Sequence, residues 1–174
     1  EAARREGRTI ALANGCFDVL HVGHARYLEG AKAEADLLVV GVNGDSSVRR
    51  LKGEGRPVMP AADRALLVAA LRAVDHVVVF EEDDPLALVR EVRPDVLVKG
   101  EDWRDKGVVG REFVESYGGR VELAPMFEGR STTYAGFDRL TNKVANGLLG
   151  EGLRTGSRVG FIDKNSDDFY QVVF

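Results

Sequence analysis

The stretch Thr9-Ile-Ala-Leu-Ala-Asn-Gly-Cys-Phe-Asp-Val-Leu-His-Val-Gly-His24 decides the fold, together with the residues that follow it up to Ala35. Thr9–Ala13 is apolar and ends at an Asn-Gly turn, which predicts a strand. His24–Ala35 has helical spacing with apolar residues on one side. A strand that turns directly into a helix places the unpaired N–H groups and partial positive charge of the helix N-terminus just beyond the strand. The stretch therefore predicts an anion site of the kind that holds phosphate.

The rest of the first 124 residues alternates short β-rich runs with longer helical patterns. Further strands are expected at 37–42, 76–80, 95–99 and 120–124. Helices are expected at 45–51 (capped by Asp45 or Ser46), 61–72, 85–92 and 110–117. This alternation predicts an α/β fold, a Rossmann-like parallel sheet with helices on both faces. Ligands bind such sheets beyond the carboxyl ends of the strands, so chemistry is expected at 14–24, 43–45, 99–103 and after 124.

Composition limits the classes of partner. The 174 residues carry 24 Lys and Arg against 28 Asp and Glu, a formal net charge of -4, so no broad positive field attracts nucleic acid or an anionic membrane. No apolar run is long enough to span a bilayer, and residues 1–8 lack the apolar stretch of a signal peptide. The single cysteine, Cys16, suits a reducing compartment. The composition predicts a cytoplasmic protein with neither nucleic acid nor membrane as partner.

Two histidines lie close to the predicted helix start. His21 and His24 flank Gly23 and can aim ring N–H donors at one phosphate, while Gly15 and Gly23 let a ligand approach the backbone. Two alternatives stay open: the histidines are a zinc pair with Asp18 nearby, or they are structural. No serine–histidine–acid set and no Walker-type loop is present, which disfavours hydrolase and kinase functions.

Residues 15–24 resemble the H-x-G-H signature of the cytidylyltransferase-like nucleotidylyltransferases, in its G-x-F-D-x-x-H-x-G-H form. The resemblance runs from about residue 9 to residue 133. It continues through Leu51-Lys52-Gly53, Arg56-Pro57, Asp63-Arg64, Val98-Lys99-Gly100, Asp102-Trp103 and Gly129-Arg130-Ser131-Thr132-Thr133. Within the family, the heptose-1-phosphate adenylyltransferase branch is most similar, and the glycerol-3-phosphate cytidylyltransferases come next. The branch resemblance rests on residues 39–45, 74–75 and 93–100.

The resemblance implies a reaction. It is the transfer of AMP from ATP to a sugar 1-phosphate, D-glycero-manno-heptose 1-phosphate, which gives an ADP-sugar for lipopolysaccharide precursor biosynthesis and releases pyrophosphate. ATP and the sugar phosphate would be the partners, Mg²⁺ would be the cofactor, and a homodimer is a candidate assembly. Two other hypotheses about function stay open. The chain could be a CTP-dependent enzyme that acts on glycerol 3-phosphate, or an inactive module for nucleotide binding or assembly.

The resemblance also implies roles for individual residues. The catalytic group is His21, His24 and Lys52, and Asp18 either meets magnesium or orients the motif. Lys52 would reach over the phosphates from a mobile loop. The nucleotide- and phosphate-binding group is Gly15, Cys16, Phe17, Asp18, Gly23, Arg64, Lys99, Gly100, Asp102, Ser131, Thr132 and Thr133. Simpler roles compete for some of these: a solvated loop for Lys52, a surface helix position for Arg64, and helix capping for Asp102 and Ser131.

Residues 134–174 do not fit the family pattern. We expect a nucleotidylyltransferase domain at 1–133 and an α-β-α extension at 134–174, with a helix at 134–149, a strand at 158–162 and a helix at 166–174. The extension resembles the opening segment of the adenylate-forming acyl-CoA synthetases, which makes it a candidate fused fragment. It lacks that family's phosphate loop and catalytic lysine motifs, so no acyl-activating chemistry is expected. Its first helix could instead complete the first domain.

Overall fold

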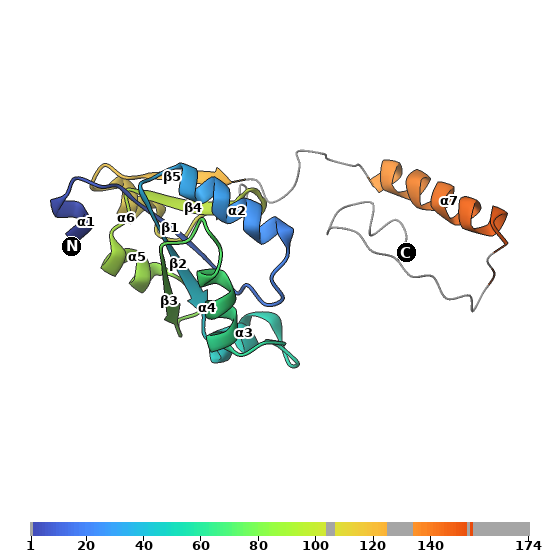
Figure 1. Ribbon diagram of the computed structural model, residues 1–174, viewed down its shortest axis with the longest axis horizontal. Coiled ribbons are helices and arrows are strands. Elements are labelled where there is room, and N and C mark those ends of the chain that lie inside the picture. Colours follow the sequence, from blue (N-terminus) through green and yellow to red (C-terminus); the bar gives the residue numbers. More distant parts are fainter. Residues whose placement is uncertain (1, 104–106, 125–133, 153, 155–174) are drawn as a thin grey trace. The chain divides into compact units, whose positions relative to one another are not determined.

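A computed structural model describes residues 2–103, 107–124, 134–152 and 154 (Figure 1). The chain divides into two compact units, Glu1–Met126 and Phe127–Phe174. The first unit holds a five-stranded sheet and the helices around it. The described part of the second unit contains the helix α7, Tyr134–Gly150.

The sheet of the first unit is entirely parallel and has the strand order β3-β2-β1-β4-β5. Its strands are β1 Ile10–Gly15, β2 Leu37–Asn43, β3 His76–Phe80, β4 Val96–Gly100 and β5 Arg120–Ala124. The central strand β1 pairs with β2 on one side and with β4 on the other. The predicted Rossmann-like parallel sheet is therefore confirmed, and β1 lies where the order of the strands reverses.

Helices cover both faces of this sheet, as predicted. The helical elements of the first unit are α1 Ala2–Arg5, α2 Val22–Ala33, α3 Asp45–Lys52, α4 Ala61–Ala69, α5 Leu86–Val92, the 3-10 turn η1 Glu101–Trp103 and α6 Arg111–Glu115. Ala11 and Ala13 of β1 pack in one core with α2 and α4. Leu12, which points the opposite way, packs in a second core with α5 and α6. Strand β1 is thus packed between two apolar cores, one on each face of the sheet.

Several predicted helix limits are corrected. Helix α2 begins at Val22, not at His24, because His21 caps its N-terminus with a ring nitrogen. The N-cap of helix α3 is Gly44, not the predicted Asp45 or Ser46, and no side chain caps this helix. The Asp45 carboxylate instead accepts a hydrogen bond from Arg64, and the Ser46 hydroxyl donates one to Glu81. The strands at 76–80 and 120–124 have the predicted bounds.

Helices α4 and α6 are shorter than predicted. Helix α4 ends at Ala69, three residues before the predicted Arg72, and α6 spans Arg111–Glu115 within the predicted 110–117. Both helices end in tight turns whose N–H groups bond back to the last helical turn, which satisfies their final carbonyls. The shortening moves no residue of the predicted site.

The helix expected at 134–149 is present in the second unit as α7, which ends one residue later, at Gly150. The predicted strand at 158–162 and helix at 166–174 lie outside the described residues, and so do Ser131, Thr132 and Thr133. The domain boundary at residue 133 stays a prediction. Among the described helices, none is both long and apolar enough to cross a membrane.

Candidate nucleotide site

A cavity of about 780 Å³ opens at the carboxyl ends of β1, β2 and β4. It brings together eight of the predicted site residues: Gly15, Cys16, Phe17, Asp18, His21, His24, Lys52 and Lys99. Seven residues to which the sequence analysis assigned no individual role also line it: Asn14, Asn43, Leu51, Arg56, Asp83, Pro85 and Trp103. The cavity lies where the strand order reverses around β1, the position at which open α/β sheets bind their ligands.

The histidine pair is held by the backbone of its own helix start. The N–H of Gly23 donates to Nδ1 of His21 at 3.1 Å, and the N–H of His21 donates to Nδ1 of His24 at 3.3 Å. A ring nitrogen that accepts a hydrogen bond carries no proton, so in each neutral ring the proton is on Nε2. Both histidines are thus fixed in the tautomer that offers an Nε2–H donor.

The environment also keeps both rings uncharged. Burial, and then the nearby His21, lower the pKa of His24 to about 4, and burial lowers the pKa of His21 as well. The ring centroids are 3.9 Å apart, and the buried Phe17 ring meets His24 edge-on at 5.3 Å. The pair therefore acts at neutral pH as two aligned hydrogen-bond donors rather than as two cations.

Asp18 is tied to a loop of the chain. One carboxylate oxygen accepts from Arg56 at 2.7 Å, and the other accepts from the N–H groups of Val58 and Met59. Burial raises the pKa of Asp18, but these hydrogen bonds outweigh it, so the pKa falls below its usual value. Both oxygens are already engaged, so a magnesium ligand does not fit here, whereas orienting the motif does.

The zinc alternative finds no support in the described part of the chain. No group of three or more His, Cys, Asp and Glu side chains that could hold a metal ion occurs there. The Nδ1 atoms of both histidines are occupied by backbone donors, and Cys16 has a pKa that burial raises despite the nearby Lys52. A raised thiol pKa is unfavourable for metal binding, which needs the thiolate.

Arg64 lies beneath the cavity rather than in its wall. Its side chain is fully buried and donates to the carbonyls of Cys16 and Met59 and to the carboxylate of Asp45. It therefore joins the turn at Cys16 to the starts of α3 and α4. The surface position that the helical pattern allowed for Arg64 is wrong, because the side chain is buried. The sequence also allowed Arg64 to brace the site instead of contacting phosphate, and its hydrogen bond to the Cys16 carbonyl fits that bracing role.

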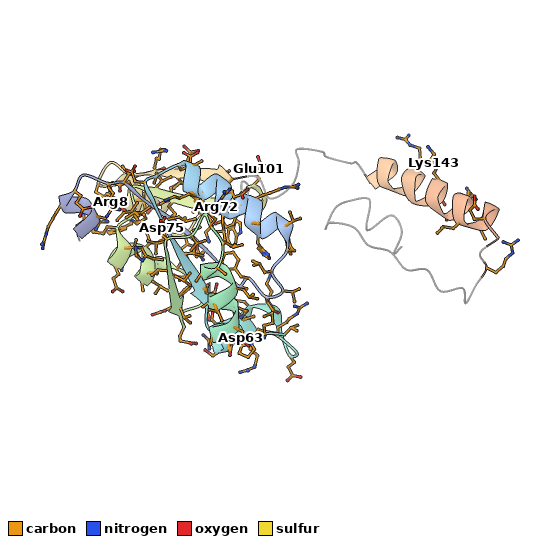
Figure 2. The ribbon with its side chains drawn as sticks, viewed as in Figure 1. Arg8, Asp63, Arg72, Asp75, Glu101 and Lys143 are labelled. Atoms are coloured by element: carbon orange, nitrogen blue, oxygen red, sulfur yellow. The ribbon has the colours of Figure 1, made fainter. Side chains whose placement is uncertain are left out.

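Three further predicted residues also lie outside the lining. Gly23 is buried in the first turn of α2, Gly100 ends β4, and Asp102 lies in η1. Glu101 opens η1 directly after β4, and its label in Figure 2 marks this end of the sheet. The backbone of this segment is thus close to the strand end that borders the cavity, but its predicted contacts with a nucleotide stay predictions.

Three segments of the chain contribute positively charged side chains to the lining of the cavity. Lys52 is the last residue of α3, so the loop position predicted for it is wrong. Lys99 is buried at the end of β4, with Nζ 4.9 Å from the centre of the Trp103 ring. Arg56, in the loop after α3, pairs with Asp18 while its side chain stays 46% exposed. Three cations and two N–H donors around one cavity suit a polyphosphate.

Sequence reasoning missed lining residues for identifiable reasons. Asn14 and Asn43 lie at the carboxyl ends of β1 and β2 and begin two of the ranges where chemistry was expected, but their residue type alone assigned no role to either. Asp83 and Pro85 follow β3 in the same way. Arg56 carried no such signal, because its place depends on the fold of the loop onto Asp18.

Comparison with known proteins agrees with this geometry. Residues 12–128 match the family model described as Cytidylyltransferase-like. The chain is 56% identical over 133 residues to the bifunctional protein HldE of Syntrophotalea carbinolica and 58% identical over 133 residues to that of Acidiphilium cryptum. In both comparisons the match covers 76% of this chain and 27% of the relative, so the chain spans about a quarter of each relative's length.

A solved structure has the same fold. The crystal structure of the lipopolysaccharide core biosynthesis protein from Thermoplasma volcanium is 30% identical and superposes with a TM-score of 0.58. The match covers 71% of this chain and all of that one. The family match, which spans most of the chain, and the histidine pair at the switch point of the sheet lead to one assignment. The chain belongs to the cytidylyltransferase-like family of nucleotidyltransferases.

Proposed function

We propose that this domain transfers AMP from ATP to D-glycero-manno-heptose 1-phosphate and releases pyrophosphate. The observation that carries the proposal is the pair of Nε2–H donors fixed at the start of α2, beside Lys52 and at the switch point of the sheet. The choice of ATP and of a heptose rests on the resemblance of residues 39–45 and 93–100 to heptose-1-phosphate adenylyltransferases. A lipopolysaccharide core biosynthesis protein among the structural relatives agrees with it.

In this mechanism a phosphate oxygen of the sugar phosphate attacks the α-phosphorus of ATP in line. The new oxygen–phosphorus bond forms as the bond between the α-phosphorus and the bridging oxygen breaks, and pyrophosphate leaves with that electron pair. The attacking oxygen is already ionised, so no protein base is needed. His21 and His24 donate N–H groups to the phosphate oxygens, and Lys52 neutralises charge on the leaving pyrophosphate.

Magnesium stays part of the proposal as a companion of the triphosphate. Mg²⁺ is usually held by substrate phosphates and water with few protein ligands, and when bound it neutralises phosphate charge. Asp18 is not assigned to it, because Arg56 and the loop backbone occupy both of its oxygens. What this chain supplies is the orientation of the turn that carries the histidines.

The test is pyrophosphate release with magnesium, with ATP and CTP each paired with heptose 1-phosphate and with glycerol 3-phosphate. We expect turnover with ATP and heptose 1-phosphate. Turnover only with CTP and glycerol 3-phosphate would keep the class of enzyme and replace the substrates. Absence of turnover in every pair, from folded protein, would favour the binding module.

The variant His24→Asn tests the histidine pair directly. Asparagine keeps an acceptor for the N–H of His21 but has no atom at the Nε2 position, so the helix start should survive and the donor is lost. We expect turnover to fall by about 100-fold to 1000-fold, as for other transition-state donors. His76→Asn, at an exposed position outside the cavity, is the matched control and should keep full activity. Equal activity in both variants would contradict the assigned role.

A further inference from the structure

Three polar side chains form a row across the sheet at the edge of the cavity. Alternate residues of a strand point to the same face, so Asn14 lies on the face of Leu12, and Lys99 lies on the face of Leu97. Asn43 belongs to the same face, because Val40 and Val42 of β2 pack into the opposite core. The row therefore runs over β2, β1 and β4 on the side of α5 and α6, and all three residues line the cavity.

Asn14, in the middle of this row, has an unsatisfied acceptor. Its side-chain oxygen is buried and accepts no hydrogen bond, which is true of no other buried side-chain nitrogen or oxygen in the described residues. The amide of Asn43 differs, because its Nδ2 donates to Ser47 Oγ at 3.0 Å, which in turn donates to the carbonyl of Glu82. A buried acceptor without a partner destabilises the protein and is uncommon in folded chains.

On the β2 side, the neighbour of Asn14 is a glycine that apolar side chains surround. Asn14 is in register with Gly41 of β2, and a Cβ on Gly41 would lie 2.5 Å from Leu88 Cδ2 and 3.2 Å from both Phe80 Cε1 and the Asn14 Cβ. Leu88 and Phe80 thus close over the glycine beside the asparagine. Asn14 lines the cavity, so a group bound there can approach its side chain, whose Cβ–Cγ bond rotates readily.

The chemistry of this wall selects the kind of group. Phosphate oxygens at neutral pH accept hydrogen bonds, so they cannot satisfy the Asn14 oxygen, whereas a hydroxyl can. Asp83, whose carboxylate is paired with Arg50, lines the same cavity after β3 and adds a further acceptor. Asn14 and Asp83 therefore suit a group with hydroxyl donors, while the histidines, Lys52 and Lys99 suit phosphate.

We propose that Asn14 is a specificity-determining residue whose side-chain oxygen accepts a hydrogen bond from a hydroxyl group of the sugar phosphate. This inference rests on the proposed function, because it assigns a contact to the acceptor in that reaction. The ribose of ATP is the other source of hydroxyl groups at this site, and the test separates the two. The histidines and lysines that line the cavity suit phosphate. This assignment adds a residue that recognises the sugar of the acceptor.

The test compares Asn14→Leu with Asn43→Leu in the full chain. Leucine has nearly the shape of asparagine but no acceptor, so Asn14→Leu removes the unsatisfied oxygen and should keep or raise the melting temperature of the free protein. The same change at Asn43 breaks a satisfied hydrogen-bond chain and should lower it. In the active enzyme, Asn14→Leu should raise the KM for heptose 1-phosphate by about tenfold or more and change the KM for ATP by less than about twofold.

Each outcome has a distinct meaning. If the KM for ATP rises instead, and 2′-deoxy-ATP removes the difference between wild type and Asn14→Leu, the ribose is the source and the acceptor assignment is overturned. If wild type turns over heptose 1-phosphate and neither KM changes in Asn14→Leu, the inference fails and the proposed function stands. If wild type is silent, the proposed function fails. The thermal comparison still decides in that case, because a loss of stability in Asn14→Leu as large as in Asn43→Leu would show a satisfied structural asparagine.

Discussion

His21 and His24 can offer Nε2–H groups to a phosphate because backbone N–H groups already occupy both Nδ1 atoms. The same hydrogen bonds define the start of α2, so the helix cap and the proposed catalytic donors are one structure. Burial makes the charged form of each ring unfavourable and thereby protects this arrangement. Acid should therefore disturb the cap and the donors together.

The pH dependence of stability follows from His24. In the unfolded chain its pKa is 6.5, and in the folded protein it is about 4. As the pH falls below 6.5, the unfolded state binds a proton that the native state does not bind, so stability is lost between pH 6.5 and about 4. Urea unfolding across this range should show a smaller loss in His24→Asn than in wild type. His76→Asn should follow the wild-type profile, and identical slopes in all three proteins would contradict the assignment.

Arg64 gives a second prediction at the scale of the residue. A fully buried guanidinium joins two carbonyls and the Asp45 carboxylate, so its removal leaves a buried network without its donor. We expect Arg64→Met to lower the free energy of unfolding by about 3 kcal/mol or more, measured by urea denaturation. Arg72→Met, at an exposed position labelled in Figure 2, should change it by less than about 0.5 kcal/mol. Similar losses in both variants would argue against the bracing role.

At the scale of elements, the strands and the buried face of α2 were predictable, and the buried face of α4 was not. Leu37–Val42 is a continuous apolar run because β2 is covered on both sides, a pattern that sequence shows directly. Helix α4 breaks its own pattern, since Leu66 is 70% exposed while Arg64 is buried. The Met59 carbonyl and two acceptors from distant segments, the Cys16 carbonyl and the Asp45 carboxylate, override the amphipathic preference there, and no local pattern contains the two distant ones.

The contact between β2 and α5 depends on Gly41. Its missing side chain leaves room for Leu88, which would lie 2.5 Å from an added Cβ, and for Asn14 beside it. We expect Gly41→Ala to destabilise the protein by about 1–3 kcal/mol through overpacking and to raise the KM for the sugar phosphate by displacing Asn14. Thermal unfolding and KM measurements on one protein sample check both effects.

Gly147→Ala is the matched control for that change. Gly147 lies within α7, and an added Cβ there would meet nothing within 4 Å. Alanine is the better helix former, so this variant should be neutral or slightly stabilising. A Gly41→Ala protein as stable as Gly147→Ala would show that β2 and α5 can separate without cost.

At the scale of the molecule, the position of the site was predictable and its full lining was not. The rule for parallel sheets pointed to residues 14–24 and 99–103, and the cavity lies there because β1 separates the two directions of strand order. Arg56 reaches the cavity only because its loop bonds to Asp18, a contact 38 residues apart in the sequence. Such contacts follow from the packing of the whole unit rather than from spacing.

The last prediction concerns the division of the chain into two units. Among the residues that the structure describes, the members of both apolar cores lie between Ala11 and Ala124, inside the first unit. A chain that ends at Met126 should keep the melting temperature of the first unit. It should also lose affinity for ATP, because the predicted phosphate contacts of Ser131, Thr132 and Thr133 go with the second unit. We expect the KM for ATP to rise by about tenfold, and alanine at these three positions in the full chain should give the same rise without truncation.

If the triple variant keeps the wild-type KM while the truncated chain does not, the second unit acts on the site through other residues. If the truncated chain melts at a lower temperature, the second unit supports the fold of the first.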